Sequence, residues 1–208
     1  MKKSIFVVNN TEINNMRGRP AIYDNQDILE KAQQVFWTQG YTATSLEDIL
    51  QAMGIGSGSF YNAFKGGKKE LFIETIRQRR TAFDDFQKSV STSEKPIDLI
   101  KDFFRSIASA DIRIHKQGCF IVNTVVEMAG LDAEIESEAI NILKDVESFY
   151  TSTIKAAQED GTLKNQTDPI LLGRYLINLW NGINVTRRMY ADSQELGPLI
   201  EMQLAVIN

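Results

Sequence analysis

The sequence TSLEDILQAMGIGSGSFYNAF, residues 44–64, contains the start and stop signals of two short helices. Thr44 and Glu47 have the spacing of a capping box that begins a helix. Apolar residues then recur at positions 46, 49, 50 and 53, which is the spacing of one helical face. Gly54 suits the left-handed residue that ends this helix, and a second short helix is expected from Gly56 or Ser57. Two short helices joined by a glycine turn predict a helix-turn-helix.

The second short helix combines an apolar side with a side of small and polar residues. Phe60, Ala63 and Phe64 are expected to face inward. Small residues at the start of the outer side allow close approach to DNA, where main-chain N–H groups, hydroxyls and amides meet phosphates and base edges. The alternative is an ordinary surface turn with solvated lysines. The predicted DNA-binding residues of this region are Thr44, Ser57, Gly58, Ser59, Tyr61, Asn62, Lys65, Lys68 and Lys69.

Helical patterns fill nearly all of the remaining chain, so we expect an all-α fold. The first helix is expected from Asp24, which caps it while Tyr23 packs on Ile28, to Gly40. A long helix follows from about Glu70. Further helices are expected over about 96–110, 118–129, 133–159 and 168–191, and Gly197-Pro198 is expected to interrupt the last segment. The expected domains are a flexible basic arm, 1–22, a helix-turn-helix domain, 23–69, and an effector-binding and dimerisation domain, 70–208.

Charge is unevenly distributed along the 208 residues, whose formal net charge is −4. Residues 1–88 carry 12 Lys/Arg and 10 Asp/Glu, a net of +2, which leaves 11 and 17, a net of −6, for residues 89–208. This is the sign expected if the N-terminal part meets an anion, although chance fluctuation explains it equally well. One cysteine and the lack of a signal-peptide core or membrane-length apolar run favour a cytoplasmic protein.

Residues 17–72 resemble the DNA-binding domain of the tetracycline-repressor (TetR/AcrR) family. The matching features are VF followed by GY and TS, the glycine turn, GSFYNAF and the lysine before ELF. The resemblance implies about nine helices, a homodimer on a palindromic operator, and release of DNA when a small molecule binds the larger domain. Two departures are Gly56-Ser57, where the family often has Ser-Lys, and a turn one residue longer before ELF. Lys68 then matches the family's lysine better than Lys69.

The arm RGRP at 17–20 is doubly cationic and extended. Such segments enter narrow minor grooves, where negative potential is concentrated. We therefore expect Arg17 and Arg19 to contact DNA, against the alternative of a solvated tail.

The larger domain is expected to supply a dimer interface and an effector site. The predicted interface residues of the last two helices, some of which belong to the core, are Leu172, Tyr175, Leu176, Leu179, Ile183, Leu199, Gln203 and Leu204. The predicted effector residues, aromatic and polar groups that are equally compatible with a core, are Phe103, Phe104, Ile107, Cys119, Phe120, Asn123, Thr124, Glu127, Phe149, Tyr150, Trp180 and Asn184.

Several alternatives remain open at the level of sequence. Cys119 suggests a sensor of oxidants or electrophiles, with His115 and Lys116 lowering its pKa, against the alternative of an inert buried thiol. An activator on the same scaffold is a further alternative, and a helical enzyme is a remote one, since no catalytic motif is recognisable. With His115 as the single histidine, we expect no metal site and no cofactor.

Overall fold

The computed structural model describes residues 25–190 and 193–208, and all regular structure in these ranges is helical. The arm with Arg17 and Arg19, and the expected cap at Asp24, lie outside the described residues. The all-α prediction is confirmed, with ten α-helices in the described ranges where about nine were expected. The helices are α1 Asn25–Gln39, α2 Leu46–Met53, α3 Ser57–Ala63, α4 Gly67–Ser91, α5 Pro96–Ala108, α6 Ile112–Gln117, α7 Phe120–Met128, α8 Ala133–Glu159, α9 Pro169–Thr186 and α10 Ser193–Leu204, followed by the 3-10 turn Ala205–Ile207.

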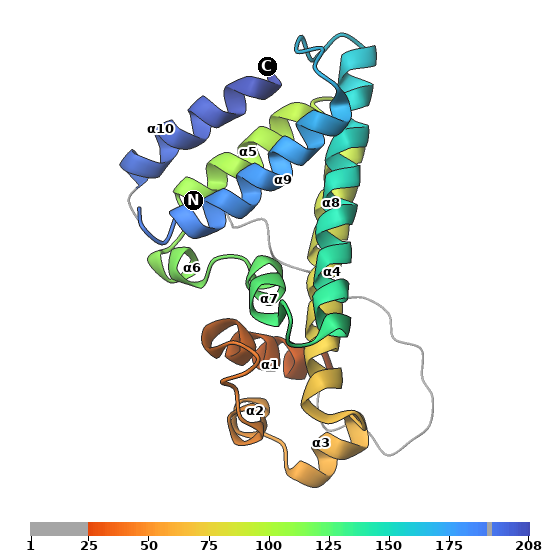
Figure 1. Cartoon of the computed structure of the whole chain (residues 1–208), viewed down its shortest axis with the longest axis vertical. Helices are drawn as coiled ribbons and strands as arrows, with labels where there is room; N and C mark the ends of the chain where they lie inside the picture. Colours follow the sequence, from red (N-terminus) through yellow and green to blue (C-terminus); the bar gives the residue numbers. More distant parts are fainter. Residues whose placement is uncertain (1–24, 191–192) are drawn as a thin grey trace.

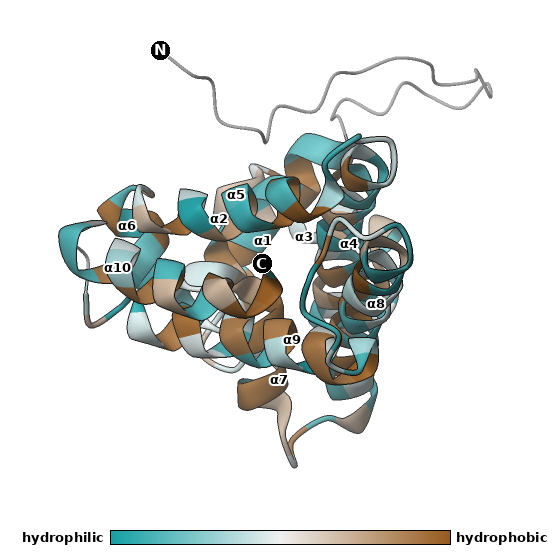
Figure 2. Ribbon diagram, turned by 90° about the horizontal axis from the view of Figure 1, so that it is seen from above, coloured by the Kyte–Doolittle hydropathy of each residue, from teal (hydrophilic) through white to brown (hydrophobic). Residues whose placement is uncertain are grey.

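Two long helices, α4 and α8, run side by side along the longest axis of the molecule (Figure 1). Helices α1 to α3 gather at one end of this pair, and α5, α9 and α10 pack near the other end. The short helices α6 and α7 lie between the two groups. Seen from above, α4 and α8 again adjoin each other, with α9 beside α8 (Figure 2).

Two hydrophobic clusters make up the core. The first joins α5, the second half of α8, α9 and α10 through residues such as Phe104, Ile154 and Leu176. The second joins α1 to α3 and the start of α4 to α7 and the first half of α8, through residues such as Phe72 and Phe120. The second cluster thus continues from the helix-turn-helix region into the larger domain. The division at residues 69 and 70 stays a prediction.

Helix boundaries show where local pattern is sufficient and where it is not. Helix α8 has the predicted bounds, because Asp132 caps it by accepting hydrogen bonds from the N–H groups of Glu134 and Ile135. The short α6 was not predicted, and α9 ends at Thr186 rather than near residue 191. No helix in the described part of the chain is long and apolar enough to cross a bilayer.

The predicted interruption at Gly197-Pro198 is wrong, because α10 continues through Pro198. Proline removes one main-chain donor from a helix, and this costs stability. The buried residues Leu196, Ile200 and Leu204 keep one face of α10 packed across that position. Tertiary packing therefore overrides the local signal.

Candidate nucleic-acid interface

Helix α2 is capped one residue later than the sequence predicted. The Ser45 Oγ accepts a hydrogen bond from the Asp48 N–H at 3.1 Å, and the Asp48 carboxylate accepts one from the Ser45 N–H at 2.9 Å. The Thr44–Glu47 box was wrong because Thr44 is buried and its Oγ1 donates to the Gly40 carbonyl. Since its hydroxyl faces the interior, Thr44 is also withdrawn from the predicted DNA contacts.

The turn between α2 and α3 has the predicted geometry. Gly54 has φ 68°, and its N–H donates to the Leu50 carbonyl at 2.9 Å. A residue other than glycine is strained at this φ, so the glycine fixes the angle between the two helices. Phe60 is fully buried and anchors α3 on the second cluster. Ala63, expected inside, is exposed.

The outer face of α3 is open to solvent. Tyr61 is 51% exposed, and Ser57, Gly58, Ser59 and Asn62 are exposed as well. A Cβ added to Gly58 would meet no atom within 4 Å, so nothing in the described chain covers the start of this helix. This face combines small residues with hydroxyl, phenol and amide groups, which are able to bond to phosphates and base edges.

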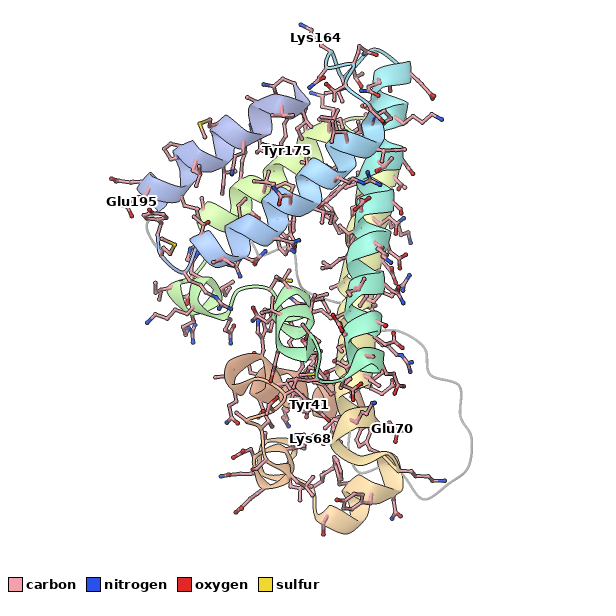
Figure 3. The ribbon with its side chains drawn as sticks, in the orientation of Figure 1. Tyr41, Lys68, Glu70, Lys164, Tyr175 and Glu195 are labelled. Atoms are coloured by element: carbon pink, nitrogen blue, oxygen red, sulfur yellow. The ribbon has the colours of Figure 1, made fainter. Side chains whose placement is uncertain are left out.

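Lys68 is engaged inside the protein rather than presented to solvent. Its Nζ donates to the main-chain oxygens of Tyr41 and Thr44, both at 2.9 Å, and lies 4.4 Å from the centre of the Tyr41 ring. Figure 3 shows Tyr41 and Lys68 together beneath α7. The ammonium thereby ties α4 to the turn between α1 and α2, and the contact of Lys68 with the DNA backbone stays a prediction.

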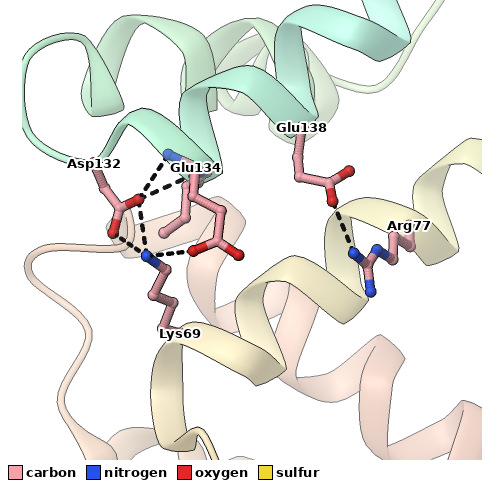
Figure 4. Close-up of polar contacts among 6 residues, drawn as sticks. Lys69, Arg77, Asp132, Glu134 and Glu138 are labelled. Atoms are coloured by element: carbon pink, nitrogen blue, oxygen red, sulfur yellow. Dashed lines mark hydrogen bonds and ion pairs between the residues drawn. The ribbon is translucent and has the colours of Figure 1, made fainter.

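Lys69 is engaged in a similar way, with carboxylates at the start of α8. Its Nζ lies 2.8 Å from an Asp132 oxygen and 2.8 Å from Glu134 Oε2 (Figure 4). These bonds raise the pKa of Lys69 and lower the pKa of Asp132. Arg77 and Glu138 form a parallel bridge at 2.8 Å. A phosphate would have to compete with two carboxylates for Lys69, whose contact with DNA also stays a prediction, while Lys65 is exposed.

Most predicted dimer residues belong to the core instead. The buried ones are Leu172, Leu176, Leu179, Ile183 and Leu204. Their assignment to the interface was wrong, since an apolar stripe looks the same in sequence whether it packs within or between chains. Tyr175, Leu199 and Gln203 are partly buried, and the Tyr175 hydroxyl donates to the Gln203 carbonyl at 2.8 Å.

The exposed apolar residues of the last two helices lie elsewhere. Leu171, Val185 and Met189 follow the outer side of α9 and the residues just after it, and Met202 lies on α10. Gly182 lies between them on the same side, and a Cβ there would meet nothing within 4 Å. We call these five residues the α9–α10 face. Its apolar composition was hidden in sequence by the stronger buried stripe.

The predicted effector residues divide between core, junction and cavity. Phe104, Ile107, Phe120, Tyr150 and Thr124 are buried, and Asn184 is buried with its amide donating to the Trp180 carbonyl. Phe103 stacks on Trp180 at 5.3 Å. Asn123 and Glu127 bond to main-chain groups outside α7. These ten core and junction positions therefore do not form one pocket, and Phe149 alone of the predicted set lines the cavity described next.

A cavity of about 580 Å³ opens between α4 and α8. Its wall includes aromatic edges, serine and threonine hydroxyls, and three aspartates against one arginine. That arginine, Arg80, already pairs with Asp145 at 2.5 Å. The lining residues are Arg80, Phe83, Asp84, Gln87, Val90, Ser91, Ser93, Pro96, Asp145, Ser148, Phe149, Ser152, Thr153, Ala156, Ala157 and Asp160.

Two family models match the chain. Residues 28–75 match "Bacterial regulatory proteins, tetR family", and residues 97–202 match "Tetracyclin repressor-like, C-terminal domain". The chain belongs to the TetR family. Family membership makes it a DNA-binding transcriptional regulator with a helix-turn-helix domain, and it sets aside the helical-enzyme alternative.

Named relatives of the TetR family cover most of the chain. The transcriptional repressor DhaR of Mycobacterium sp. (strain GP1) is 31% identical over 82% of this chain and 85% of its own length. The repressor ComR of Escherichia coli (strain K12) is 27% identical over 86% of this chain and 87% of its own.

Solved structures of TetR-type proteins share the fold. The reduced form of E. coli NemR has a TM-score of 0.77 at 18% identity, covering 88% of this chain and 96% of its own. A CifR cysteine mutant in complex with a 26-base-pair operator has a TM-score of 0.75 at 22% identity, covering 91% of this chain and 100% of its own. At these identities the likeness concerns the fold alone.

Proposed function

We propose that this TetR-family regulator is a homodimeric repressor that binds a palindromic operator and leaves it when a small molecule binds the larger domain. The proposal rests on the amphipathic character of α3: Phe60 is fully buried, while Tyr61 and Asn62 are exposed to solvent. The names of DhaR and ComR favour repression over activation. Such a regulator acts where the chromosome lies, which in a bacterium is the cytoplasm.

The DNA contacts are assigned to the exposed face of α3. Tyr61 and Asn62 approach base edges or phosphates, and the small residues Ser57, Gly58 and Ser59 allow the helix to enter the major groove. Lys65 neutralises a flanking phosphate. Arg17 and Arg19 of the arm enter the adjoining minor groove, in keeping with their charge and their position before α1.

The α9–α10 face is assigned to the homodimer. Val185 is 60% exposed, and Met189 and Met202 are 69% and 67% exposed. Exposed apolar side chains on the last two helices favour association with a second copy, and a two-fold dimer places two α3 helices on successive half-sites. Val185→Asp with Met202→Glu is expected to convert a dimer into a folded monomer, measured by light scattering after gel filtration. A dimer that persists in this variant would contradict the assignment.

The effector is assigned to the cavity between α4 and α8. The aspartates Asp84 and Asp160, together with the paired Asp145, leave the wall with a net negative charge, and Phe83 and Phe149 supply apolar contact. This lining suits an organic cation that also carries a group able to form hydrogen bonds with the serine and threonine hydroxyls of the wall. The cavity lies against α4, the helix that leads to α3, so a ligand there is placed to alter the position of α3.

A second candidate function is sensing of oxidants or electrophiles by Cys119. Its side chain is partly exposed, and Arg79 and Arg187 lie close enough for their charges to interact with it. Cys119→Ser is expected to keep DNA binding but lose release by hydrogen peroxide, and release that persists in Cys119→Ser would contradict this candidate.

The main proposal is tested by selection of binding sites from a random DNA pool with the full-length protein, followed by gel shifts. A palindromic consensus that two protomers occupy is the expected result, with affinity falling steeply as salt rises. A pool that remains random after selection would overturn the proposal.

A further inference from the structure

The Glu127 carboxylate of α7 is bound by the turn between α1 and α2. Oε2 accepts a hydrogen bond from the Tyr41 N–H at 2.9 Å, and Oε1 accepts one from the Thr42 N–H at 2.7 Å. Two successive main-chain N–H groups that point the same way form a concave anion site. Here the anion is a side chain of the larger domain, 85 residues further along the chain than Thr42.

Gly40 gives the turn the shape that this contact requires. Its φ is +84°, and a Cβ at this position would lie 3.1 Å from both carboxylate oxygens of Glu127. A side chain at residue 40 would therefore both strain the backbone and press on the carboxylate. The glycine and the glutamate form one fitted contact.

The main-chain carbonyl groups of the same turn are bound by a side chain of α4. Lys68 accepts nothing and donates to the carbonyls of Tyr41 and Thr44, while Glu127 accepts from the N–H groups of Tyr41 and Thr42. The turn is thus held between a cation of α4 and an anion of α7. Hydrogen bonds that involve a charged partner are stronger and more directional than neutral ones. This fixes the turn, and with it α2, relative to both helices.

Helix α7 is itself anchored to the end of α9. Asn123 donates to the Gln117 carbonyl at 2.9 Å, and Arg188 donates to both the Gln117 carbonyl and Asn123 Oδ1 at 2.9 Å. The neighbouring Arg187, which is 5% exposed, donates to the carbonyls of Ile114 and Gly118 at 2.9 and 2.7 Å. A continuous set of polar contacts therefore leads from the end of α9 through α7 to the turn.

We propose that Glu127 is a positioning residue for operator binding, which holds the helix-turn-helix domain at a fixed angle to the helices of the dimer. A displacement of the end of α9 then reaches α2 and α3 through α7, in addition to any movement of α4. The inference rests on the proposed dimeric operator, because a fixed angle affects DNA binding only where it sets the distance between two linked α3 helices. Without the carboxylate, each helix-turn-helix domain still folds but tolerates a wider range of half-site spacings.

The test compares Glu127→Gln with Glu134→Gln in the full-length protein. Both substitutions remove one negative charge, but Glu134 is exposed and its partner Lys69 retains Asp132. Glutamine at 127 offers one acceptor oxygen and places an NH2 group against an N–H donor. Affinity is measured for the selected operator and for versions with the half-site spacing changed by one base pair. The readout is the dissociation constant for the altered spacing divided by that for the selected operator.

Glu127→Gln is expected to reduce this ratio about five- to tenfold, as for a modest coupling between sites, while its unfolding midpoint stays near that of Glu134→Gln. An unchanged ratio in Glu127→Gln would overturn the inference, and so would an equal reduction in Glu134→Gln. If Glu127→Gln does not fold, Glu127→Asp, which keeps the charge on a shorter stem, takes the same measurement. Wild-type protein that ignores half-site spacing would instead contradict the proposed dimeric operator.

Discussion

Gly173 of α9 packs directly against Thr151 of α8. A Cβ on Gly173 would overlap the Thr151 hydroxyl and lie 3.2 Å from the Glu147 carbonyl. We expect Gly173→Val to destabilise the protein by about 1–3 kcal/mol, as overpacking of a tight contact does. Thermal unfolding is the measurement, with Gly197→Ala as the control, because a Cβ there meets nothing within 4 Å. Equal midpoints for Gly173→Val and the wild type would show that the two helices are not held this closely in solution.

Tyr61 and Asn62 are predicted to affect DNA binding without affecting folding. The double change Tyr61→Ala with Asn62→Ala removes exposed side chains of α3. We expect the free energy of unfolding to change by no more than about 0.5 kcal/mol and operator affinity to fall at least about tenfold. Fluorescence anisotropy with labelled operator measures the affinity. Tyr190→Ala, which removes an aromatic ring that is 40% exposed beyond α9, is the control and should bind normally.

Phe60 is predicted to affect both properties. It is fully buried and contacts the rings of Tyr61 and Phe64 at centroid distances of 5.1 and 5.6 Å. Phe60→Ala leaves a cavity beneath α3, and we expect a loss of about 3–5 kcal/mol in the free energy of unfolding. Denaturant titration measures the loss. A loss below 1 kcal/mol would mean that α3 is not anchored through this ring.

His115 is predicted to make the folded state less stable below neutral pH. Burial, and next the charge of Arg187, lower the pKa of His115 from the usual 6.5. Above pH 6.5 the imidazole is neutral in both states. As the pH falls below 6.5, the unfolded chain binds the proton first, so stability declines by up to about 1.4 kcal/mol per pH unit until the folded-state pKa is reached.

Unfolding midpoints between pH 7.5 and 5.5 measure this slope. The variant His115→Gln cannot titrate in the range and is expected to show a flatter dependence. If the two proteins have parallel profiles, His115 does not carry the effect.

The sequence predicted the elements whose signals are local. The bounds of α8, the glycine turn at Gly54 and the buried Phe60 follow from capping, backbone conformation and periodicity. The choice between Thr44 and Ser45 as N-cap was not local, since T-S-L-E and S-L-E-D both have capping-box spacing. Burial of Thr44 against Gly40 decided between them.

The roles of the larger domain's residues required the tertiary structure. Leu176 and Val185 are both apolar residues of α9, but one is fully buried and the other is 60% exposed. Helical periodicity predicted the buried stripe that contains Leu176. The interface candidates are apolar residues outside this stripe, such as Val185. Glu127 looked like a ligand-binding carboxylate on a partly apolar helix, and its partners are main-chain N–H groups that no side-chain pattern reveals.

The second hydrophobic cluster has a consequence for where this chain can be divided. Phe120 of α7 packs on Trp37 of α1 at 6.0 Å and on Phe72 of α4 at 5.5 Å. A fragment cut after α4 would lack Phe120 and would expose the faces of Trp37 and Phe72 that it covers. Chimeras that exchange the helix-turn-helix domain of this chain are therefore expected to fold best when α7 and the first turns of α8 are carried with the N-terminal helices.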